Sequence, residues 1–164
     1  LDSQMPVTKG KIASWHKNRI AAGIPEGSID LTPDRALLLE AGLDQLNAVD
    51  FDKGCYVGQE VTARMHYRGL VKRRLVPLMV DGEPPKPDSA IFWNDKIIGN
   101  SKSAAPFNSA INSNNKSAIC LALLKLTDLH SILESTNGYL KVGLRTASLA
   151  LPEWMVPLPS PPKR

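Results

Sequence analysis

The second half of the sequence is divided into short apolar runs separated by turn-forming residues. One run from Leu75 to Val80 stops at Asp81-Gly82, and Asn94-Asp95 separates two further runs with the spacing of a tight hairpin. The segments 117–124 and 139–149 add further strand candidates. Several short strands at this spacing are typical of a small barrel or sandwich, so the sequence predicts antiparallel β-structure here.

The first half has a different texture, with helix-like spacing and glycines at the expected ends of helices. Residues 9–22 predict an amphipathic helix, and a second helix is expected from Gly58, as its N-cap, to just before Gly69. A short helix over 42–47 and an extended segment over 48–52 are also expected. Together with the strands, these patterns predict the α+β class.

Near residues 70–76 the sequence changes from helix-like spacing to short strand-like runs, and this change predicts a boundary between two regions of the chain. Residues 1–70 are expected to form a mixed α and β region, and residues 71–151 a β-barrel. Residues 152–164 hold five prolines and predict a loosely attached tail. Within the second region, the Ser/Asn/Ala-rich stretch 101–116 predicts a loop.

A loop of eight residues, Lys-Gly-Cys-Tyr-Val-Gly-Gln-Glu, carries the most unusual chemistry of the chain. Its glycines allow a tight turn that would hold the thiol of Cys55 at the mouth of the following helix, where cationic neighbours promote reactivity. The alternative is a small buried cysteine in a connecting loop. The residues singled out are Lys53, Gly54, Cys55, Tyr56, Gly58, Gln59 and Glu60, with Arg64 just beyond them.

The composition excludes several classes of protein. The two cysteines, Cys55 and Cys120, form neither a CxxC motif nor a metal-finger spacing, which argues against a disulfide framework and favours a reducing compartment. The longest apolar run, 118–124, is too short to span a membrane, and no secretory signal is visible. A net charge of +4 says little about partners.

The eight-residue loop resembles the signature of the YgfZ-type folate-binding proteins, which are iron–sulfur cluster assembly relatives of the glycine-cleavage aminomethyltransferase. Residues 19–27 resemble the segment before that signature, and the Gly-Ile-Pro-Glu-Gly within them is similar to the mitochondrial branch and its bacterial counterparts. Residues 68–74 resemble its continuation, and 98–103 a glycine–serine turn of the barrel domain. The resemblance covers most of residues 1–150.

This resemblance implies the C-terminal part of an aminomethyltransferase-like folate-binding domain, followed by a small antiparallel barrel. Since family members carry a further region before this point, the chain resembles their C-terminal half, and the missing N-terminal half is an expected partner. The implied location is the bacterial cytoplasm or, in a eukaryote, the mitochondrial matrix. No membrane association is expected.

The resemblance also assigns functional roles. Cys55 would act as an iron–sulfur cluster ligand or a redox thiolate, with the cluster bound transiently and shared with an A-type iron–sulfur carrier protein. Trp15 and Arg19 would bind tetrahydrofolate or a related folate, the tryptophan by stacking. Trp15 is equally well explained as a core residue that packs with Ile12 and Ile20 on one helix face.

Two alternative functions remain open at the level of the sequence. The first is a tetrahydrofolate-dependent aminomethyltransferase, although Ala21 stands where that relative has an acidic residue, and this argues against an enzyme. The second is a nucleic-acid-binding module over residues 64–74, which hold five Arg or Lys residues, Tyr67 and no acid. An exposed basic surface is the more common explanation of such a run.

Overall fold

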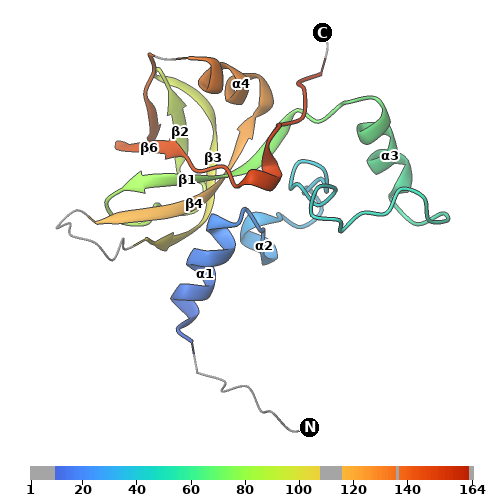
Figure 1. Ribbon diagram of the computed structural model, residues 1–164, viewed down its shortest axis with the longest axis horizontal. Coiled ribbons are helices and arrows are strands. Elements are labelled where there is room, and N and C mark those ends of the chain that lie inside the picture. Colours follow the sequence, from blue (N-terminus) through green and yellow to red (C-terminus); the bar gives the residue numbers. More distant parts are fainter. Residues whose placement is uncertain (1–9, 108–115, 136, 163–164) are drawn as a thin grey trace, which may run out of the picture.

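The computed structural model describes residues 10–107, 116–135 and 137–162, and it has a β-barrel, which lies on the left in Figure 1. The helices are α1 Ile12–Ala21, α2 Gly27–Asp30, α3 Gln59–Tyr67 and α4 Leu126–Glu134, with a 3-10 turn at Glu153–Met155. The strands are β1 Arg73–Asp81, β2 Ala90–Trp93, β3 Lys96–Pro106, β4 Ser117–Lys125, β5 Leu140–Val142 and β6 Arg145–Leu149. The predicted mixture of helices and a barrel is confirmed.

Six antiparallel strands close the barrel in the order β1-β4-β3-β2-β5-β6. The longest pairing joins β1 to β4, from Arg73 opposite Lys125 to Asp81 opposite Ser117. The ring closes where β6 pairs with residues 78–80 of β1. The hairpin predicted at Asn94-Asp95 is confirmed, because both residues have the positive φ angles, 45° and 65°, that a two-residue turn between twisted strands requires.

The alternation of side chains along the strands creates two apolar clusters. One fills the barrel interior and includes Val76, Leu78, Val80, Cys120, Ala122 and Leu124. The other lies on the outer wall and includes Leu75, Ile119 and Leu121, with Ile20 of α1 packed onto them. Successive strand residues point to opposite faces, so a single run such as 118–124 supplies both clusters. The outer cluster holds α1 against β3 and β4.

Two predictions for the barrel region are wrong. Residues 98–103 lie within strand β3 instead of forming a turn, and residues 101–106 continue that strand instead of forming a loop; residues 108–115 lie outside the described part of the chain. The serines are tolerated in the strand because their hydroxyls have partners. Ser101 Oγ donates to the Lys86 carbonyl at 2.8 Å, and Ser103 Oγ donates to Asp30 at 2.9 Å.

Two further predictions, for the segment before the signature loop and for the C-terminal tail, are also wrong. Residues 42–47 form a series of turns and 48–52 contain no strand. The tail packs tightly around its 3-10 turn: Met155 is fully buried, Leu158 is buried, and Trp154 Nε1 donates to the Ala22 carbonyl at 2.8 Å. The sequence patterns also missed α4, whose Leu126 and Leu129 join the interior cluster. The proposed domain boundaries stay predictions.

A buried arginine explains why residues 42–47 are not helical. Arg74 on β1 is fully buried, and its Nη1 donates to the Leu39 carbonyl at 2.6 Å and lies 3.5 Å from Asp44 Oδ1. Its Nη2 contacts Gln45. Gly42 has φ of 80°, and a Cβ there would overlap the guanidinium. The chain therefore turns around this side chain instead of forming a helix.

No helix in the described ranges is long and apolar enough to cross a membrane.

Gly99 provides a direct test of the barrel packing. A Cβ at this position would overlap the carbonyl oxygen of Leu123 on β4, which is backbone and cannot move independently. We expect Gly99→Ala to lower the free energy of unfolding by about 1–3 kcal/mol, as overpacked cores do. Urea denaturation measures the change. Gly54→Ala is the matched control, since nothing lies within 4 Å of the position that its Cβ would take, and equal losses in both variants would contradict the assignment.

Candidate functional site

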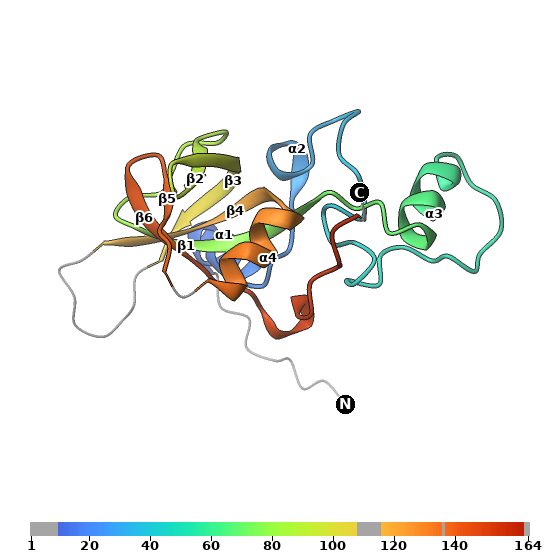
Figure 2. The same cartoon turned by 90° about the horizontal axis from the view of Figure 1, so that it is seen from above.

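The signature loop lies on an arm that stands apart from the barrel. Both views show α3 and the loop before it at the side of the molecule, away from the strands (Figures 1 and 2). Gly58 is the N-cap of α3 with φ of 86°, a left-handed conformation that favours glycine. The backbone N–H of Tyr56 donates to Gln59 Oε1 at 3.2 Å. The helix predicted between Gly58 and Gly69 is confirmed.

One face of α3 attaches the arm to the rest of the molecule. Met65 is buried in the same apolar cluster as Leu39 and Val71, and Thr62 is also buried. Two apolar side chains near the start of α3 are open to solvent: Val57, in the preceding loop, is fully exposed, and Val61, in the first turn of the helix, is 55% exposed. The arm is therefore anchored through Met65 and Thr62, and it carries two exposed valines close in sequence to the cysteine.

Cys55 is exposed within this loop. The alternative of a buried connecting-loop cysteine is wrong. The cations expected to act on its thiol have other partners, since Lys53 Nζ lies 4.8 Å from the centre of the Tyr56 ring and Arg64 pairs with Glu60 at 2.5 Å. The loop is thus ordered by its own side chains, and the thiol is left accessible.

Cys120 has the opposite environment. It lies on β4 with its side chain in the barrel interior and is fully buried. Burial raises the pKa of the Cys120 thiol to about 12, because the thiolate would lose its hydration. Only the neutral thiol is populated there at physiological pH, and this thiol is neither an accessible nucleophile nor a metal ligand.

The described residues contain no cluster of three or more His, Cys, Asp or Glu side chains arranged to hold a metal ion. Within that part of the chain, Cys55 therefore offers a single sulfur ligand. Three aromatic rings from the two sides of the loop in sequence form a cluster. His66 stacks on Phe51 at 3.9 Å between centroids, and Tyr67 meets both rings edge-on. The sequence patterns missed this cluster, because Phe51 and His66 are fifteen positions apart and no local pattern links them.

The two residues assigned to folate differ in availability. Trp15 on α1 is 59% exposed and Ile12, one turn earlier, is 73% exposed, so the core explanation fails for both. Of the three residues, Ile20 is the one that packs in the core. Arg19 is buried and fully engaged: its Nη1 donates to Asp30 at 2.9 Å and to the Ile24 carbonyl at 3.1 Å, and its Nε lies 2.5 Å from Glu26.

Arg19 belongs to a buried network that joins α1 and α2 to the barrel. The Asp30 carboxylate has no exposed surface and accepts bonds from Arg19, from the backbone N–H of Glu26, and from both the N–H and the hydroxyl of Ser103. Each of its oxygens is satisfied, as a buried carboxylate requires. The position of Arg19 in this network makes it an internal structural residue.

The basic run 64–74 does not form a continuous surface. Arg74 is buried beneath the preceding segment, Arg73 pairs with Glu40 at 2.9 Å, and Arg64 pairs with Glu60. The ion pairs of Arg73 and Arg64 neutralise positive charge that would otherwise attract the phosphates of a nucleic acid. The arrangement gives no support to a nucleic-acid interface.

Several relatives of this chain carry the same name. The chain is 49% identical over 76 residues to the mitochondrial iron–sulfur cluster assembly factor IBA57 of Mus musculus, a match covering 46% of this chain and 21% of that protein. The human protein of that name is 48% identical over 69 residues, covering 42% and 19%. The homologue of Neurospora crassa is 42% identical over 89 residues, covering 52% and 20%. No family model matches the chain.

These matches confirm the resemblance to the mitochondrial branch of the YgfZ-type proteins. The matched segment spans about a fifth of the length of each of the three relatives, so the activity and partners of a whole relative are not automatically properties of this chain.

The contrast between the two cysteines predicts their reactivity. We expect iodoacetamide to modify the exposed Cys55 readily, and Cys120 at least about a hundredfold more slowly, since burial excludes the reagent and raises the pKa of Cys120 to about 12. Timed labelling of the native protein followed by peptide mass spectrometry measures both rates. Labelling in urea is the control that should abolish the difference. Modification of Cys120 before Cys55 in native buffer would overturn the assignment.

Proposed function

We propose that this chain acts in iron–sulfur cluster assembly as an accessory protein, with Cys55 as its working group. The observation that carries the proposal is the exposed thiol on an arm that stands apart from the barrel (Figure 2). The names of the relatives support the process and, in a eukaryotic cell, the mitochondrion as its place; the matrix is the part of it that we propose.

A single thiolate cannot hold a cluster alone, because iron–sulfur clusters are held by several protein ligands, usually four. The cluster is therefore treated as cargo shared with a second protein that supplies the remaining thiolates, and an A-type carrier has the required chemistry. The exposed Val57 and Val61 give such a partner an apolar surface beside the cysteine. A redox role for Cys55 toward a partner's thiols would use the same exposure.

Folate binding is a second element of the proposal, and the described residues fit a folate in part. Trp15 presents an exposed ring on which a pterin could stack. Arg19 does not fit, because its guanidinium is engaged by Asp30 and Glu26. The aminomethyltransferase-like relationship of residues 1–70 belongs to this element as well. Ala21 supplies no carboxylate for transfer chemistry, which separates the proposal from an aminomethyltransferase.

Cluster binding is tested by anaerobic reconstitution of the chain with iron, sulfide and an A-type carrier protein. We expect a complex that carries iron with the wild-type chain and with Cys120→Ala, and none with Cys55→Ser, because the exposed sulfur is the ligand. Iron content and the visible absorption of the co-eluting complex are measured. Retention of the complex by Cys55→Ser would remove the proposed role of this cysteine.

Folate affinity is tested by calorimetric titration of the same chain with tetrahydrofolate. One exposed stacking contact contributes about 1–3 kcal/mol, which is less than the loss of freedom on association. We therefore expect a dissociation constant weaker than about 0.1 mM, equivalent to roughly 5.5 kcal/mol. A micromolar constant that is lost in Trp15→Ala would show that these residues suffice for binding.

A further inference from the structure

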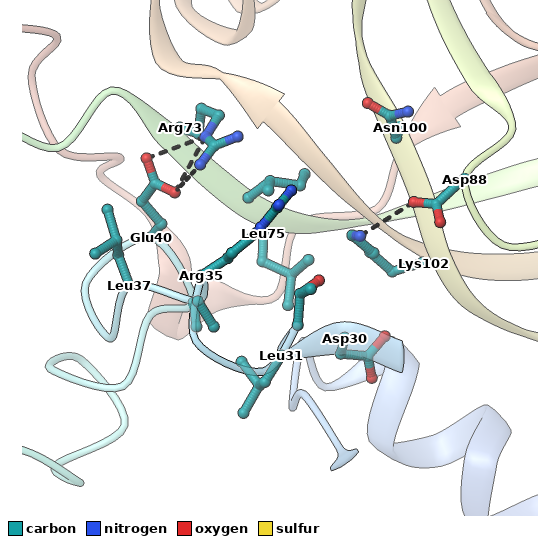
Figure 3. A pocket seen from close by; sticks show the side chains of 14 residues that line it. Asp30, Leu31, Arg35, Leu37, Glu40, Arg73, Leu75, Asp88, Asn100 and Lys102 are labelled. Carbon is teal, nitrogen blue, oxygen red and sulfur yellow. Dashed lines mark hydrogen bonds and ion pairs between the residues drawn. The ribbon is translucent and has the colours of Figure 1, made fainter. Parts of the chain in front are cut away.

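A cavity of about 350 Å³ lies between the segment 30–41 and the barrel wall, on strands β1, β3 and β4 (Figure 3). Its volume falls in the range of small-molecule pockets, about 300–1,000 Å³. None of the signature-loop residues 53–60 lines it. The cavity is therefore separate from the cysteine site, and its ligand is independent of the proposed function.

The side chains that line the cavity carry three positive and three negative charges, but one of the cations has no partner among them. Glu40 is paired with Arg73 at 2.9 Å, and Asp88 with Lys102 at 3.2 Å. Asp30, also at the wall, has its oxygens occupied by Arg19 and Ser103. The remaining cation is Arg35, which forms no ion pair or side-chain hydrogen bond with another described residue. Arg35 is thus the cation at the cavity wall whose charge is not engaged by a described acid.

Lys102 adds unused hydrogen-bonding capacity on the opposite side. Its side chain is only 12% exposed, and its ammonium contacts one carboxylate, that of Asp88, which is itself 72% exposed. An ammonium carries three donors, so two are free to serve a ligand. Figure 3 shows Arg35 and Lys102 reaching into the cavity from different sides, with Asn100 nearby on β3.

The floor of the cavity is apolar. Leu75 is buried on β1, and Leu37 and Leu123 are half-buried at the wall. Carboxylates form strong, charge-assisted hydrogen bonds with guanidinium and ammonium groups, and an apolar body would cover the leucines. A single negative charge would pair with Arg35, whereas a phosphate would bring further negative charge beside Glu40 and Asp88.

We propose that this cavity binds a small organic monocarboxylate, whose carboxylate lies between Arg35 and Lys102 and whose apolar body lies on Leu75 and Leu123. Arg35 supplies the planar fork that recognises a carboxylate, and Lys102 supplies the second cationic contact. The segment 30–41 is held in place by the Asp30 network and by Arg74, so the site is formed before a ligand arrives.

The test is an NMR titration of the ¹⁵N-labelled chain with benzoate, a monocarboxylate with an apolar ring, and with benzamide, its neutral counterpart. We expect benzoate to shift the amide resonances of residues 35–37 and 100–102 and to leave residues 53–60 unchanged. Benzamide should bind at least about tenfold more weakly, because it lacks the charge that Arg35 and Lys102 recognise.

Arg35→Gln is the decisive variant, since Arg35 is exposed on a turn and its replacement should leave the fold intact. We expect about a tenfold or greater loss of benzoate affinity. Arg68→Gln, which removes an exposed arginine at the end of α3, is the matched control and should bind normally. The proposal is overturned if benzoate leaves residues 35–37 and 100–102 unshifted, if Arg35→Gln binds as tightly as the wild type, or if inorganic phosphate binds the cavity more tightly than benzoate.

Discussion

The burial of one guanidinium, that of Arg74, determines how the turns of residues 38–47 rest on the barrel. The side chain leaves β1 and lies fully buried under the turns of residues 38–47, where it bonds the Leu39 carbonyl and lies beside Asp44. Burial lowers the pKa of Arg74, and the neighbouring Asp44 carboxylate acts in the opposite direction. A buried charge is tolerated only with such partners. Because these turns support the cavity on one side and precede the cysteine arm on the other, both candidate sites depend on this contact.

The parts of the structure that local sequence determines were predictable. The strands at 75–80 and 117–124, the two-residue turn at Asn94-Asp95 and the glycine cap of α3 each depend on neighbours in the chain, and each was predicted correctly. The same holds for Cys120, whose apolar neighbours indicated a buried strand. For Cys55, the loop and the following helix were predictable, and the exposure of the thiol came from the structure.

The predictions that failed involve contacts between distant positions. The bond from Arg74 to Leu39 spans 35 residues, and the bond from Ser103 to Asp30 spans 73. The first replaces an expected helix with turns, and the second allows a serine-rich stretch to continue as a strand. The cavity has the same origin, since Arg35 and Lys102 belong to no local motif and become neighbours only through these contacts. The tail was misjudged because its prolines suggested mobility, whereas Trp154 and Met155 find partners near α1.

The closure of the barrel limits how another protein can recognise this chain. An open sheet offers an unpaired edge to which a partner can add a strand through backbone hydrogen bonds. Here the six strands form a ring, and where β6 does not reach along β1, the Leu75 N–H donates to the Glu40 carbonyl at 2.8 Å. The segment around Glu40 thus occupies the position of a missing strand. A strand of another protein cannot pair with the barrel at this point, so we expect a partner to contact side chains on the helices and loops.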